Sequence, residues 1–363
     1  MTLATRLDPT ILREYDIRGI IGENIGETQF RAIGQAFGSQ LRAEGGQSVA
    51  VGYDGRLSSP TLEAAVIEGL AQAGVRVLRA GCGPSPMCYF ADHYLGTDAA
   101  VMVTGSHNPP DYNGIKMTML GRAFYGADIQ ALGARVSAGD YVEGNGEIVN
   151  ASVFDAYVDR LMQGFAGDKD LSVAWDPGNG AISPIIHRII KTIGGNNIIL
   201  NRSIDSTFPN HHPDPTIKKN IIQISDYIKN HSFDLGISFD GDGDRVGIID
   251  NNGELVYSDI ILLLLVLDLY EEKKDITAVA DVKCSKVLFD TLKNNGINYV
   301  IDGYGIYPYK KKGLTFVPQL FYKEIMLPFG VQATQIHLNY WDEKKFNNFS
   351  KFLFKNKNKF LSF

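Results

Sequence analysis

The sequence predicts an α/β fold in which related α/β/α domains with mixed sheets follow one another along the chain. Two observations lead to this prediction. Short β-rich runs alternate with helical stretches, which is the pattern of sheets covered by helices. In addition, a strand runs three times into a small polar turn that contains an aspartate, namely Asp54, Asp176 and Asp281. This weak internal similarity predicts three related units, with boundaries near residues 155 and 257.

The elements of the three units are predicted in chain order. The first unit contains strands 48–53, 75–78 and 99–103 and helix 61–73, in which apolar residues recur at helical spacing. The second contains strands 172–175, 235–239 and 246–249 and helix 182–193. The third contains helix 260–270, strand 276–280 and helix 286–294. Because residues 260–267 are all apolar, we expect this last unit's first helix to be buried on most sides.

Length, charge and apolar runs narrow the class of protein. At about 150 residues per domain, 363 residues allow two or three domains. The net charge of −6 argues against a dedicated nucleic-acid binder, since such proteins carry a basic excess. Residues 1–8 lack the apolar core of a signal peptide, and the run 260–267 is far shorter than the roughly 20 residues that span a bilayer. We therefore expect a soluble, cytoplasmic protein that binds neither nucleic acid nor membranes.

The loop at residues 104–110 follows the predicted strand 99–103 and contains Ser106 and His107. Ser106 therefore lies near the carboxyl end of a strand, where open α/β sheets place their active sites. A turn in which both side chains only make local hydrogen bonds is the alternative interpretation. A serine hydrolase is not indicated, because Ser106 lacks the Gly-x-Ser-x-Gly frame. Adjacent Ser and His are also not spaced in sequence to act as nucleophile and base.

A second loop, residues 240–245, lies between two predicted apolar strands. Its carboxylates occupy alternate positions with glycines between them: Asp240, Asp242 and Asp244. Three such carboxylates repel one another in a dry turn but offer oxygen ligands to a hard divalent cation. An EF-hand does not fit, because the sixth loop position is Arg245 and not glycine. Magnesium is favoured, since few protein ligands leave room for water and a phosphate oxygen, and a solvated acidic hairpin is the alternative.

Five short motifs follow one another between about residue 10 and about residue 295. They are Tyr-Asp-Ile-Arg-Gly at 15–19, Thr-Gly-Ser-His-Asn-Pro at 104–109, Asn-Gly-Ile-Lys at 113–116, Asp-Pro-Gly-Asn-Gly at 176–180 and Asp-Gly-Asp-Gly-Asp-Arg at 240–245. In their order and spacing the chain resembles the α-D-phosphohexomutase superfamily, most closely its bacterial phosphomannomutase/phosphoglucomutase branch. One departure is Gly105, where many members carry alanine.

The resemblance implies an isomerase that interconverts hexose 1-phosphate and hexose 6-phosphate through a hexose 1,6-bisphosphate. Ser106 would be carried as a phosphoserine. The implied ligands of Mg²⁺ are a phosphoserine oxygen of Ser106 and the carboxylates of Asp240, Asp242 and Asp244. Lys116 would act as a general acid/base once burial or a neighbouring cation lowers its pKa.

The resemblance also implies roles for four residues around the phosphate groups. Arg18 and Arg245 would clamp phosphoryl oxygens, for which a bidentate guanidinium is better suited than an ammonium group. Tyr15 would contact the substrate. His107 would support catalysis through a hydrogen bond within its loop. For Arg18 and Tyr15, purely structural contacts are the alternative.

The domain plan that the resemblance implies is incomplete in this sequence. The first domain spans 1–155, the second 156–256 and part of a third 257–305. The family's third-domain loop Gly-Glu-x-Ser-Gly-His and its fourth-domain loop of Arg-x-Ser-Gly-Thr type do not occur in the sequence. We therefore expect the fourth domain to be absent, residues 306–363 to be a non-homologous or disordered tail, and mutase activity to be impaired. A shift of reading frame near the three lysines at 310–312 would produce such a tail.

Two other functions stay open at this point. A magnesium-dependent phosphatase would result if water took the phosphoryl group from Ser106. A non-catalytic fragment that binds magnesium or sugar phosphate is the second alternative. We expect a monomeric or weakly associating protein. The sequence does not indicate whether glucose, mannose or glucosamine phosphate is the substrate, because the loops that read the sugar are not recognisable.

Overall fold

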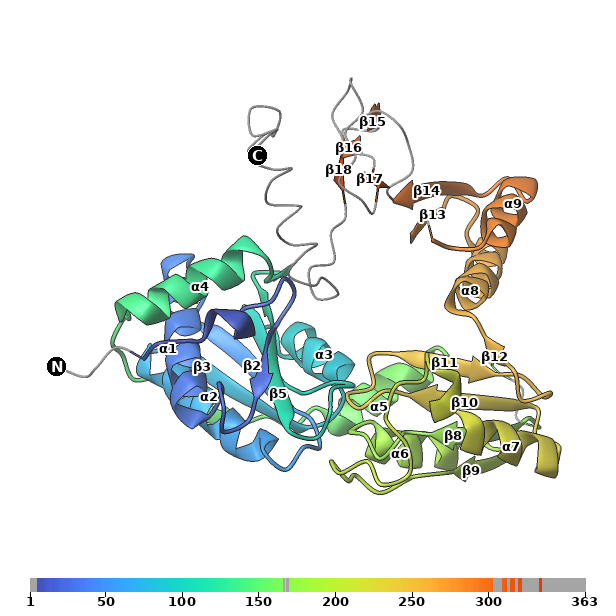
Figure 1. The fold of residues 1–363 in the computed structure, drawn as a ribbon, viewed down its shortest axis with the longest axis horizontal. Coiled ribbons are helices and arrows are strands. Elements are labelled where there is room, and N and C mark those ends of the chain that lie inside the picture. Colours follow the sequence, from blue (N-terminus) through green and yellow to red (C-terminus); the bar gives the residue numbers. More distant parts are fainter. Residues whose placement is uncertain are drawn as a thin grey trace, which may run out of the picture. The chain divides into compact units, whose positions relative to one another are not determined.

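The structure is a computed structural model. It describes residues 5–165, 167, 170–281 and 283–302, together with the backbone of four short strands between residues 309 and 334. The chain divides into two compact units, Met1–Val256 and Tyr257–Phe363. The first unit contains two mixed sheets that follow one another in the sequence (Figure 1).

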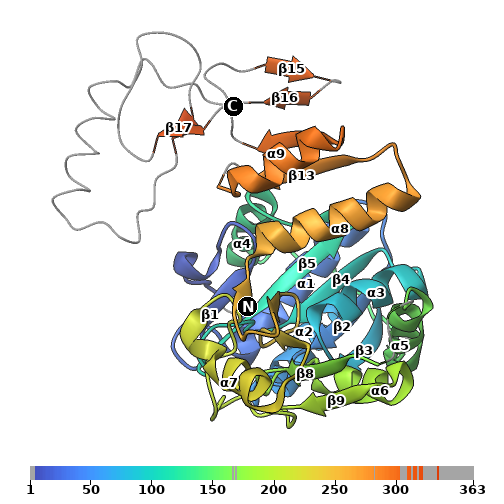
Figure 2. The ribbon, with the colours of Figure 1, turned by 90° about the vertical axis from the view of Figure 1, so that its right-hand side faces the viewer.

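The first sheet has seven strands. Six of them lie in the order β1-β5-β4-β2-β3-β7, and the short strand β6 pairs with β5. The strands are β1 (Ile17–Ile20), β2 (Ser48–Tyr53), β3 (Arg76–Cys82), β4 (Ala99–Val103), β5 (Tyr112–Met119), β6 (Arg122–Ala123) and β7 (Ile148–Asn150). Strand β2 is parallel to β3 and β4, and β3 is parallel to β7, whereas β5 is antiparallel to β1 and β4. Strand β4 is buried along its whole length, because helices cover both faces of the sheet (Figure 2).

Five helices belong to this part of the chain: α1 (Glu27–Ala43), α2 (Ser59–Gln72), α3 (Ser85–Leu95), α4 (Ala127–Ala138) and α5 (Phe154–Gln163). Alternation along β2 separates the two faces of the sheet. Val49 and Val51 lie in the core that contains α1, α2 and α4, whereas Ala50 lies in the cluster with α3 and α5. Helices α1 and α2 pack closely, since a Cβ at Gly69 would lie 2.0 Å from the carbonyl oxygen of Arg31.

The second sheet has the order β12-β11-β10-β8-β9. Its strands are β8 (Ser172–Asp176), β9 (Asn196–Ile199), β10 (Leu235–Phe239), β11 (Val246–Ile249) and β12 (Leu255–Val256), and its helices are α6 (Ser183–Ile193) and α7 (Ile222–His231). Ile224 and Ile228 of α7 pack against Ala174 and Ile249 on one face. On the other side, Ile185 and Ile186 of α6 share a core with residues of α3 and α5. This shared core joins the two sheets into one unit.

The second unit has α8 (Ser258–Glu272), β13 (Thr277–Asp281), α9 (Lys286–Asn294) and β14 (Asn298–Asp302), with β13 parallel to β14. Leu263, Val266 and Leu288 are buried in its core. The expectation that α8 is covered on most sides is wrong among the described residues, because Leu264 and Leu265 are 59% and 63% exposed. In the core of this unit α8 packs with α9 and the β13–β14 pair, which leaves Leu264 and Leu265 exposed.

Beyond β14 the backbone of four strands is described: β15 (Tyr309–Lys311), β16 (Leu314–Phe316), β17 (Gln319–Phe321) and β18 (Ala333–Thr334). The rest of the predicted tail, residues 306–363, lies outside the described residues. The predicted shift of reading frame near residues 310–312 therefore stays a prediction. Among the described residues, no helix is both long and apolar enough to cross a membrane. The predicted fold class, tandem α/β/α units with mixed sheets, is confirmed.

Candidate active site

Ser106 lies on the loop that follows β4, at the carboxyl end of that strand. It is 4% exposed, and its φ of 49° places the backbone in the left-handed region, which is uncommon for a residue with a Cβ. The Ser106 hydroxyl donates a hydrogen bond of 3.1 Å to Oδ2 of Asp240. It also lies 3.3 Å from Nδ1 of His107, a contact within the loop of the kind expected for His107. The structure therefore brings the two predicted loops together.

The second loop gathers three carboxylates between β10 and β11. Oxygens of Asp240, Asp242 and Asp244 lie within 4.8 Å of one another. Asp240 and Asp242 are fully buried. Burial and then the charges of Asp242 and Asp244 raise the pKa of Asp240 to about 8. Burial also opposes ionisation of Asp242, but Lys116 outweighs it and lowers the pKa of Asp242 below its ordinary value.

Lys116, on β5, extends into this carboxylate cluster. Its Nζ lies 2.7 Å from Oδ2 of Asp242 and 2.5 Å from Oδ2 of Asp244. Burial alone would lower the pKa of Lys116, but these two carboxylates outweigh burial and raise the pKa above its usual value. The lowered pKa that a general acid/base role of Lys116 requires is therefore not met by the arrangement in this structure. The reason is that the ammonium group itself neutralises the cluster.

The residues of the cluster fit a divalent cation. The donor set consists of carboxylate oxygens, which Mg²⁺ and Ca²⁺ prefer. Oδ1 of Asp242 is buried and has no hydrogen-bond partner among the described residues. An unpartnered buried oxygen of this kind is costly unless a ligand satisfies it. In addition, the ammonium group of Lys116 already sits among the carboxylates as a cation.

Arg18 and Tyr15 lie close to one another in sequence but in different environments. Arg18, on β1, is buried: its Nη1 donates to the carbonyl oxygen of Thr104 over 2.8 Å and its Nη2 lies 2.5 Å from Oδ2 of Asp16. Tyr15 is 77% exposed and stacks on Tyr125 with ring centroids 6.4 Å apart. Arg18 thus contacts the backbone beside Ser106, whereas Tyr15 presents an aromatic face to solvent.

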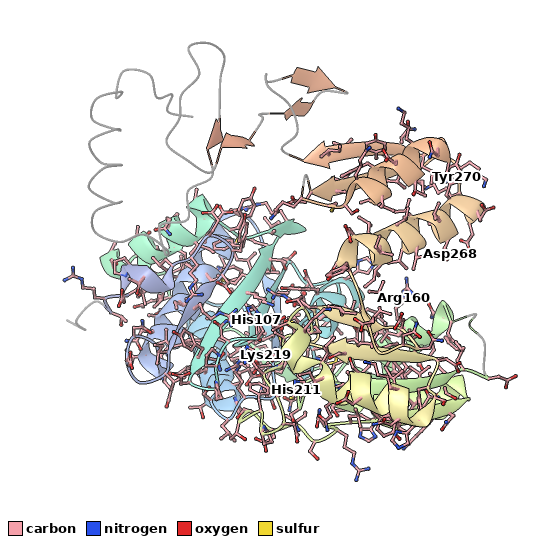
Figure 3. The ribbon with its side chains drawn as sticks, turned by 45° about the vertical axis from the view of Figure 1, so that its right-hand side comes forward. His107, Arg160, His211, Lys219, Asp268 and Tyr270 are labelled. Atoms are coloured by element: carbon pink, nitrogen blue, oxygen red, sulfur yellow. The ribbon has the colours of Figure 1, made fainter. Side chains whose placement is uncertain are left out.

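His107 and Arg245 come from the two different loops. Burial and then the charge of Arg245 lower the pKa of His107, so its ring is favoured in the neutral form. The side chain of Arg245 is exposed, while its backbone N–H donates to Oδ1 of Asp240 over 3.1 Å. Figure 3 labels His107 in the region where the two sheets of the first unit meet.

The two loops are in direct backbone contact. A Cβ at Gly241 would lie 2.4 Å from the carbonyl oxygen of Ser106, so only glycine allows the observed approach. A second link joins the turn after β2 to the segment after β9, where Leu57 N–H donates to Ser206 Oγ over 3.3 Å. This segment contains none of the five motifs recognised in the sequence.

Two side chains hold Asp176, which ends β8 and begins the motif Asp-Pro-Gly-Asn-Gly. His211 Nε2 lies 2.8 Å from Oδ2 of the fully buried Asp176. Asn201 donates to Oδ1 of Asp176 over 2.9 Å. Burial alone would lower the pKa of His211, but its hydrogen bond with Asp176 outweighs burial and raises the pKa. This pair fastens the segment after β9 to the end of β8.

Sequence reasoning also missed three residues that contact the two loops: Asp54, Arg56 and Ser85. Asp54 and Arg56 belong to the Asp-Gly-Arg turn after β2. From the sequence alone, this turn indicated only internal similarity. Its position at the carboxyl end of a strand next to β4 was the available signal.

Comparison with known proteins assigns both sheets to described domain families. Residues 9–142 match phosphoglucomutase/phosphomannomutase, alpha/beta/alpha domain I, and residues 155–253 match domain II of the same family. A phosphomannomutase/phosphoglucomutase of Pseudomonas aeruginosa is 38% identical over 293 residues, which cover 81% of this chain and 63% of that protein.

Two further proteins extend the likeness. A phosphomannomutase of Vibrio cholerae is 31% identical over 329 residues, covering 87% of this chain and 69% of that protein. The crystal structure of a phosphoglucomutase/phosphomannomutase family protein from Burkholderia thailandensis superposes with a TM-score of 0.79 at 37% identity, covering 82% of this chain and 67% of that one. On this evidence the chain belongs to the phosphoglucomutase/phosphomannomutase family.

Proposed function

We propose that this chain carries the phosphoserine and metal-binding part of a hexose-phosphate mutase. The reaction would interconvert hexose 1-phosphate and hexose 6-phosphate through a hexose 1,6-bisphosphate. One observation carries the proposal: the hydroxyl of buried Ser106 lies 3.1 Å from Asp240 at the edge of the three-carboxylate cluster. A phosphoryl group on Ser106 would there lie beside oxygen ligands suited to a divalent cation.

The proposed reaction has two transfers. A sugar hydroxyl attacks the phosphorus on Ser106 Oγ, the O–P bond to serine breaks, and the hydroxyl proton passes to a base. The bisphosphorylated sugar then turns, Ser106 Oγ loses its proton and attacks the phosphorus of the other phosphoryl group, the bond from that phosphorus to the sugar oxygen breaks, and the sugar oxygen takes up a proton. Asp240, Asp242 and Asp244 would hold Mg²⁺, which when bound offsets negative charge on the phosphoryl group.

Lys116 is the proposed general acid/base, and its surroundings determine when it can serve. Burial lowers the pKa of its ammonium group, whereas the carboxylates of Asp242 and Asp244 raise it. The proposed role therefore requires those carboxylates to be engaged by a cation rather than by the lysine itself. Its place on β5 supports the assignment, since Nζ already reaches the cluster beside Ser106.

Four further residues are proposed to act on the substrate and the loop. Arg18 would bind phosphoryl oxygens from its buried position beside the carbonyl of Thr104. Arg245, exposed at the end of the metal loop, would bind the same groups from the other side. The exposed Tyr15 would contact the sugar, and His107 would hold the Ser106 hydroxyl through Nδ1.

The chain spans 63% of the length of the Pseudomonas aeruginosa relative. Its activity, substrates and partners are therefore proposals, as are the domain boundaries 1–155, 156–256, 257–305 and 306–363. The change from the first sheet to the second between β7 and β8, and the start of the second compact unit at Tyr257, support the first two boundaries.

Mass spectrometry of the Ser106 peptide tests the proposal. Protein purified with magnesium and incubated with glucose 1,6-bisphosphate should gain one phosphoryl group on this peptide, and Ser106→Ala should gain none. Phosphorylation elsewhere, or an unmodified Ser106 in folded protein that binds Mg²⁺, would favour a non-catalytic binding fragment.

A coupled assay of the same preparations separates the catalytic possibilities. Conversion of glucose 1-phosphate into glucose 6-phosphate would support a mutase. Release of inorganic phosphate without isomerised sugar would instead support a residual phosphatase. Normal turnover would contradict the expectation of impaired activity.

A further inference from the structure

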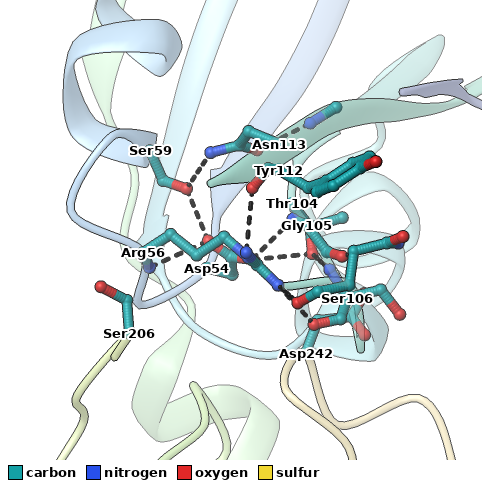
Figure 4. Close-up of polar contacts among 12 residues, drawn as sticks. Asp54, Arg56, Ser59, Thr104, Gly105, Ser106, Tyr112, Asn113, Ser206 and Asp242 are labelled. Atoms are coloured by element: carbon teal, nitrogen blue, oxygen red, sulfur yellow. Dashed lines mark hydrogen bonds and ion pairs between the residues drawn. The ribbon is translucent and has the colours of Figure 1, made fainter. Parts of the chain in front are cut away.

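Arg56 lies beneath the loop that carries Ser106, and its side chain is 3% exposed. Its guanidinium group donates hydrogen bonds to four backbone carbonyl oxygens of this region (Figure 4). Nη1 donates to Pro109 over 2.5 Å and to Tyr112 over 2.9 Å. Nη2 donates to Ser106 over 3.0 Å and to Asn108 over 2.6 Å. One side chain therefore holds both ends of the turn that follows Ser106.

Asp54 completes the support from the same turn. Its Oδ2 accepts hydrogen bonds from Thr104 Oγ1 over 2.8 Å and from Gly105 N–H over 2.9 Å. Its Oδ1 accepts from Ser59 Oγ over 2.5 Å, which anchors the carboxylate to the first turn of α2. Nε of Arg56 lies 3.5 Å from Oδ2 of Asp54. Asp54 thus accepts hydrogen bonds from N–H and O–H groups of the loop, and Arg56 donates hydrogen bonds to carbonyl oxygens of the same region.

The backbone between these anchors has a conformation that needs such support. Ser106 has a φ of 49°, and its N–H donates to Oγ1 of Thr104 over 2.8 Å. A non-glycine residue keeps this unfavourable conformation only where surrounding contacts over-determine it. Rotation of Ser106 into extended backbone would move its hydroxyl away from Asp240. The direction of the hydroxyl therefore depends on the bonds that hold the loop.

Packing leaves the guanidinium little freedom. A Cβ at Gly105 would lie 2.0 Å from Nε of Arg56, so the guanidinium rests directly on the loop backbone. The ring of Phe208, from the segment after β9, lies 5.5 Å from Cζ of Arg56 on another side. A planar group with donors on both of its terminal nitrogens is needed to reach four carbonyls at once. An ammonium group, as in lysine, lacks this shape.

We propose that Arg56 is a positioning residue for phosphoryl transfer: it keeps the Ser106 backbone in the conformation that directs the hydroxyl at the carboxylate cluster. The inference rests on the proposed function of Ser106, and Arg56 does not touch the reacting atoms. It acts through the carbonyl oxygens of Ser106, Asn108, Pro109 and Tyr112. Its loss should therefore slow transfer more than it weakens sugar-phosphate binding.

The test compares Arg56→Lys with Arg79→Lys. Arg79, on β3, is a matched control. Its guanidinium group forms a bidentate pair with the buried Glu63 of α2 and does not contact the Ser106 loop. The probe is glucose 1,6-bisphosphate with magnesium, and the readout is the rate of phosphorylation of the Ser106 peptide. We expect Arg56→Lys to lower the maximal rate on the order of a hundredfold, the loss typical of a small misplacement of a reacting group.

Three companion measurements separate positioning from general damage. The bisphosphate concentration at half-maximal rate should change little in Arg56→Lys. Hydrogen exchange of the peptide 104–114 should become faster in Arg56→Lys and not in Arg79→Lys. Guanidinium chloride at a non-denaturing concentration should partly restore the rate of Arg56→Ala, because free guanidinium can occupy the vacated position. A folded Arg56→Lys with wild-type rate and wild-type exchange would overturn the inference.

A second pair of variants applies if Arg56→Lys does not fold. Thr104→Val keeps the side-chain volume but removes the hydroxyl that joins Asp54 to the Ser106 amide, whereas Thr104→Ser keeps it. We expect slow phosphorylation in the first and near wild-type rate in the second, and equal rates would overturn the positioning argument. An unlabelled wild-type protein would contradict the proposed function instead, and the exchange of peptide 104–114 would then still decide whether Arg56 holds the loop.

Discussion

Ser85 binds Asp242 through both its backbone and its side chain. Ser85 N–H donates to the Asp242 carbonyl oxygen over 2.8 Å, and Ser85 Oγ donates to Asp242 Oδ2 over 2.5 Å. Ser85 begins α3 against the first sheet, whereas Asp242 lies on the loop after β10 in the second. The carboxylate cluster is therefore oriented partly by the first sheet's helix, and the side chains around a metal ligand commonly tune its affinity.

The first prediction concerns this contact. Replacing Ser85 with alanine should weaken binding of Mg²⁺ or Mn²⁺ by about tenfold, because Oδ2 of Asp242 loses a donor that orients it. Mn²⁺ titration followed by electron paramagnetic resonance measures the effect. Ser137→Ala is the control, since its hydroxyl donates only to the Gly133 carbonyl within α4. Equal affinities in the two variants would show that Ser85 does not orient the ligand.

The second prediction concerns the contact between the two loops. Gly241→Ala would place a methyl group 2.4 Å from the Ser106 carbonyl oxygen, so the loops must separate. We expect a loss of about 1 to 3 kcal/mol in the free energy of unfolding, together with much slower phosphorylation of Ser106. Gly164→Ala is the control, because no atom of the described residues outside its chain neighbours lies within 4 Å of a Cβ at that position. Urea unfolding of both variants measures this loss. Equal free energies of unfolding for Gly241→Ala and Gly164→Ala would contradict the prediction.

The sequence predicted the elements that hold the site because their signals are local. The runs 48–53, 99–103, 235–239 and 246–249 are apolar and bounded by turn residues, and they coincide with β2, β4, β10 and β11. The alternate aspartates of loop 240–245 predicted a cluster for a similar reason, since three carboxylates lie within five residues and the glycines between them allow the backbone to turn tightly.

What the sequence did not predict depends on contacts between distant segments. The pKa of Lys116 is raised because Asp242 and Asp244, more than a hundred residues away, meet its ammonium group. Arg56 was not recognised from the sequence, because its four partners are backbone carbonyls, which carry no sequence signal. The exposure of one side of α8 was not predicted, because an apolar run in the sequence does not indicate how many neighbouring elements cover the helix.

The third prediction is a pH dependence from His211 and Asp176. Asp176 raises the pKa of His211 above its ordinary 6.5 in the folded protein. The pair therefore stabilises the fold fully below about pH 6.5, and this contribution is lost as the pH rises through the higher folded value. His211→Gln should cost about 1 kcal/mol at pH 5.5 and less at pH 8.5. Urea unfolding at the two pH values measures both costs, and a larger cost at the higher pH would contradict the assignment.

The fourth prediction concerns competition between Lys116 and a divalent cation. The ammonium group neutralises the cluster at 2.7 Å from Asp242 and 2.5 Å from Asp244, so Lys116→Met leaves the carboxylates to repel one another. Without divalent ions this variant should unfold at a lower temperature than the wild type. Mg²⁺ should then stabilise it by about 1 kcal/mol more than it stabilises the wild type, because no ammonium group must be displaced.

Lys218→Met, which removes a surface lysine near Glu254, is the control and should respond to Mg²⁺ as the wild type does. Equal Mg²⁺-induced shifts in melting temperature for Lys116→Met and the wild type would show that lysine and cation do not share the site.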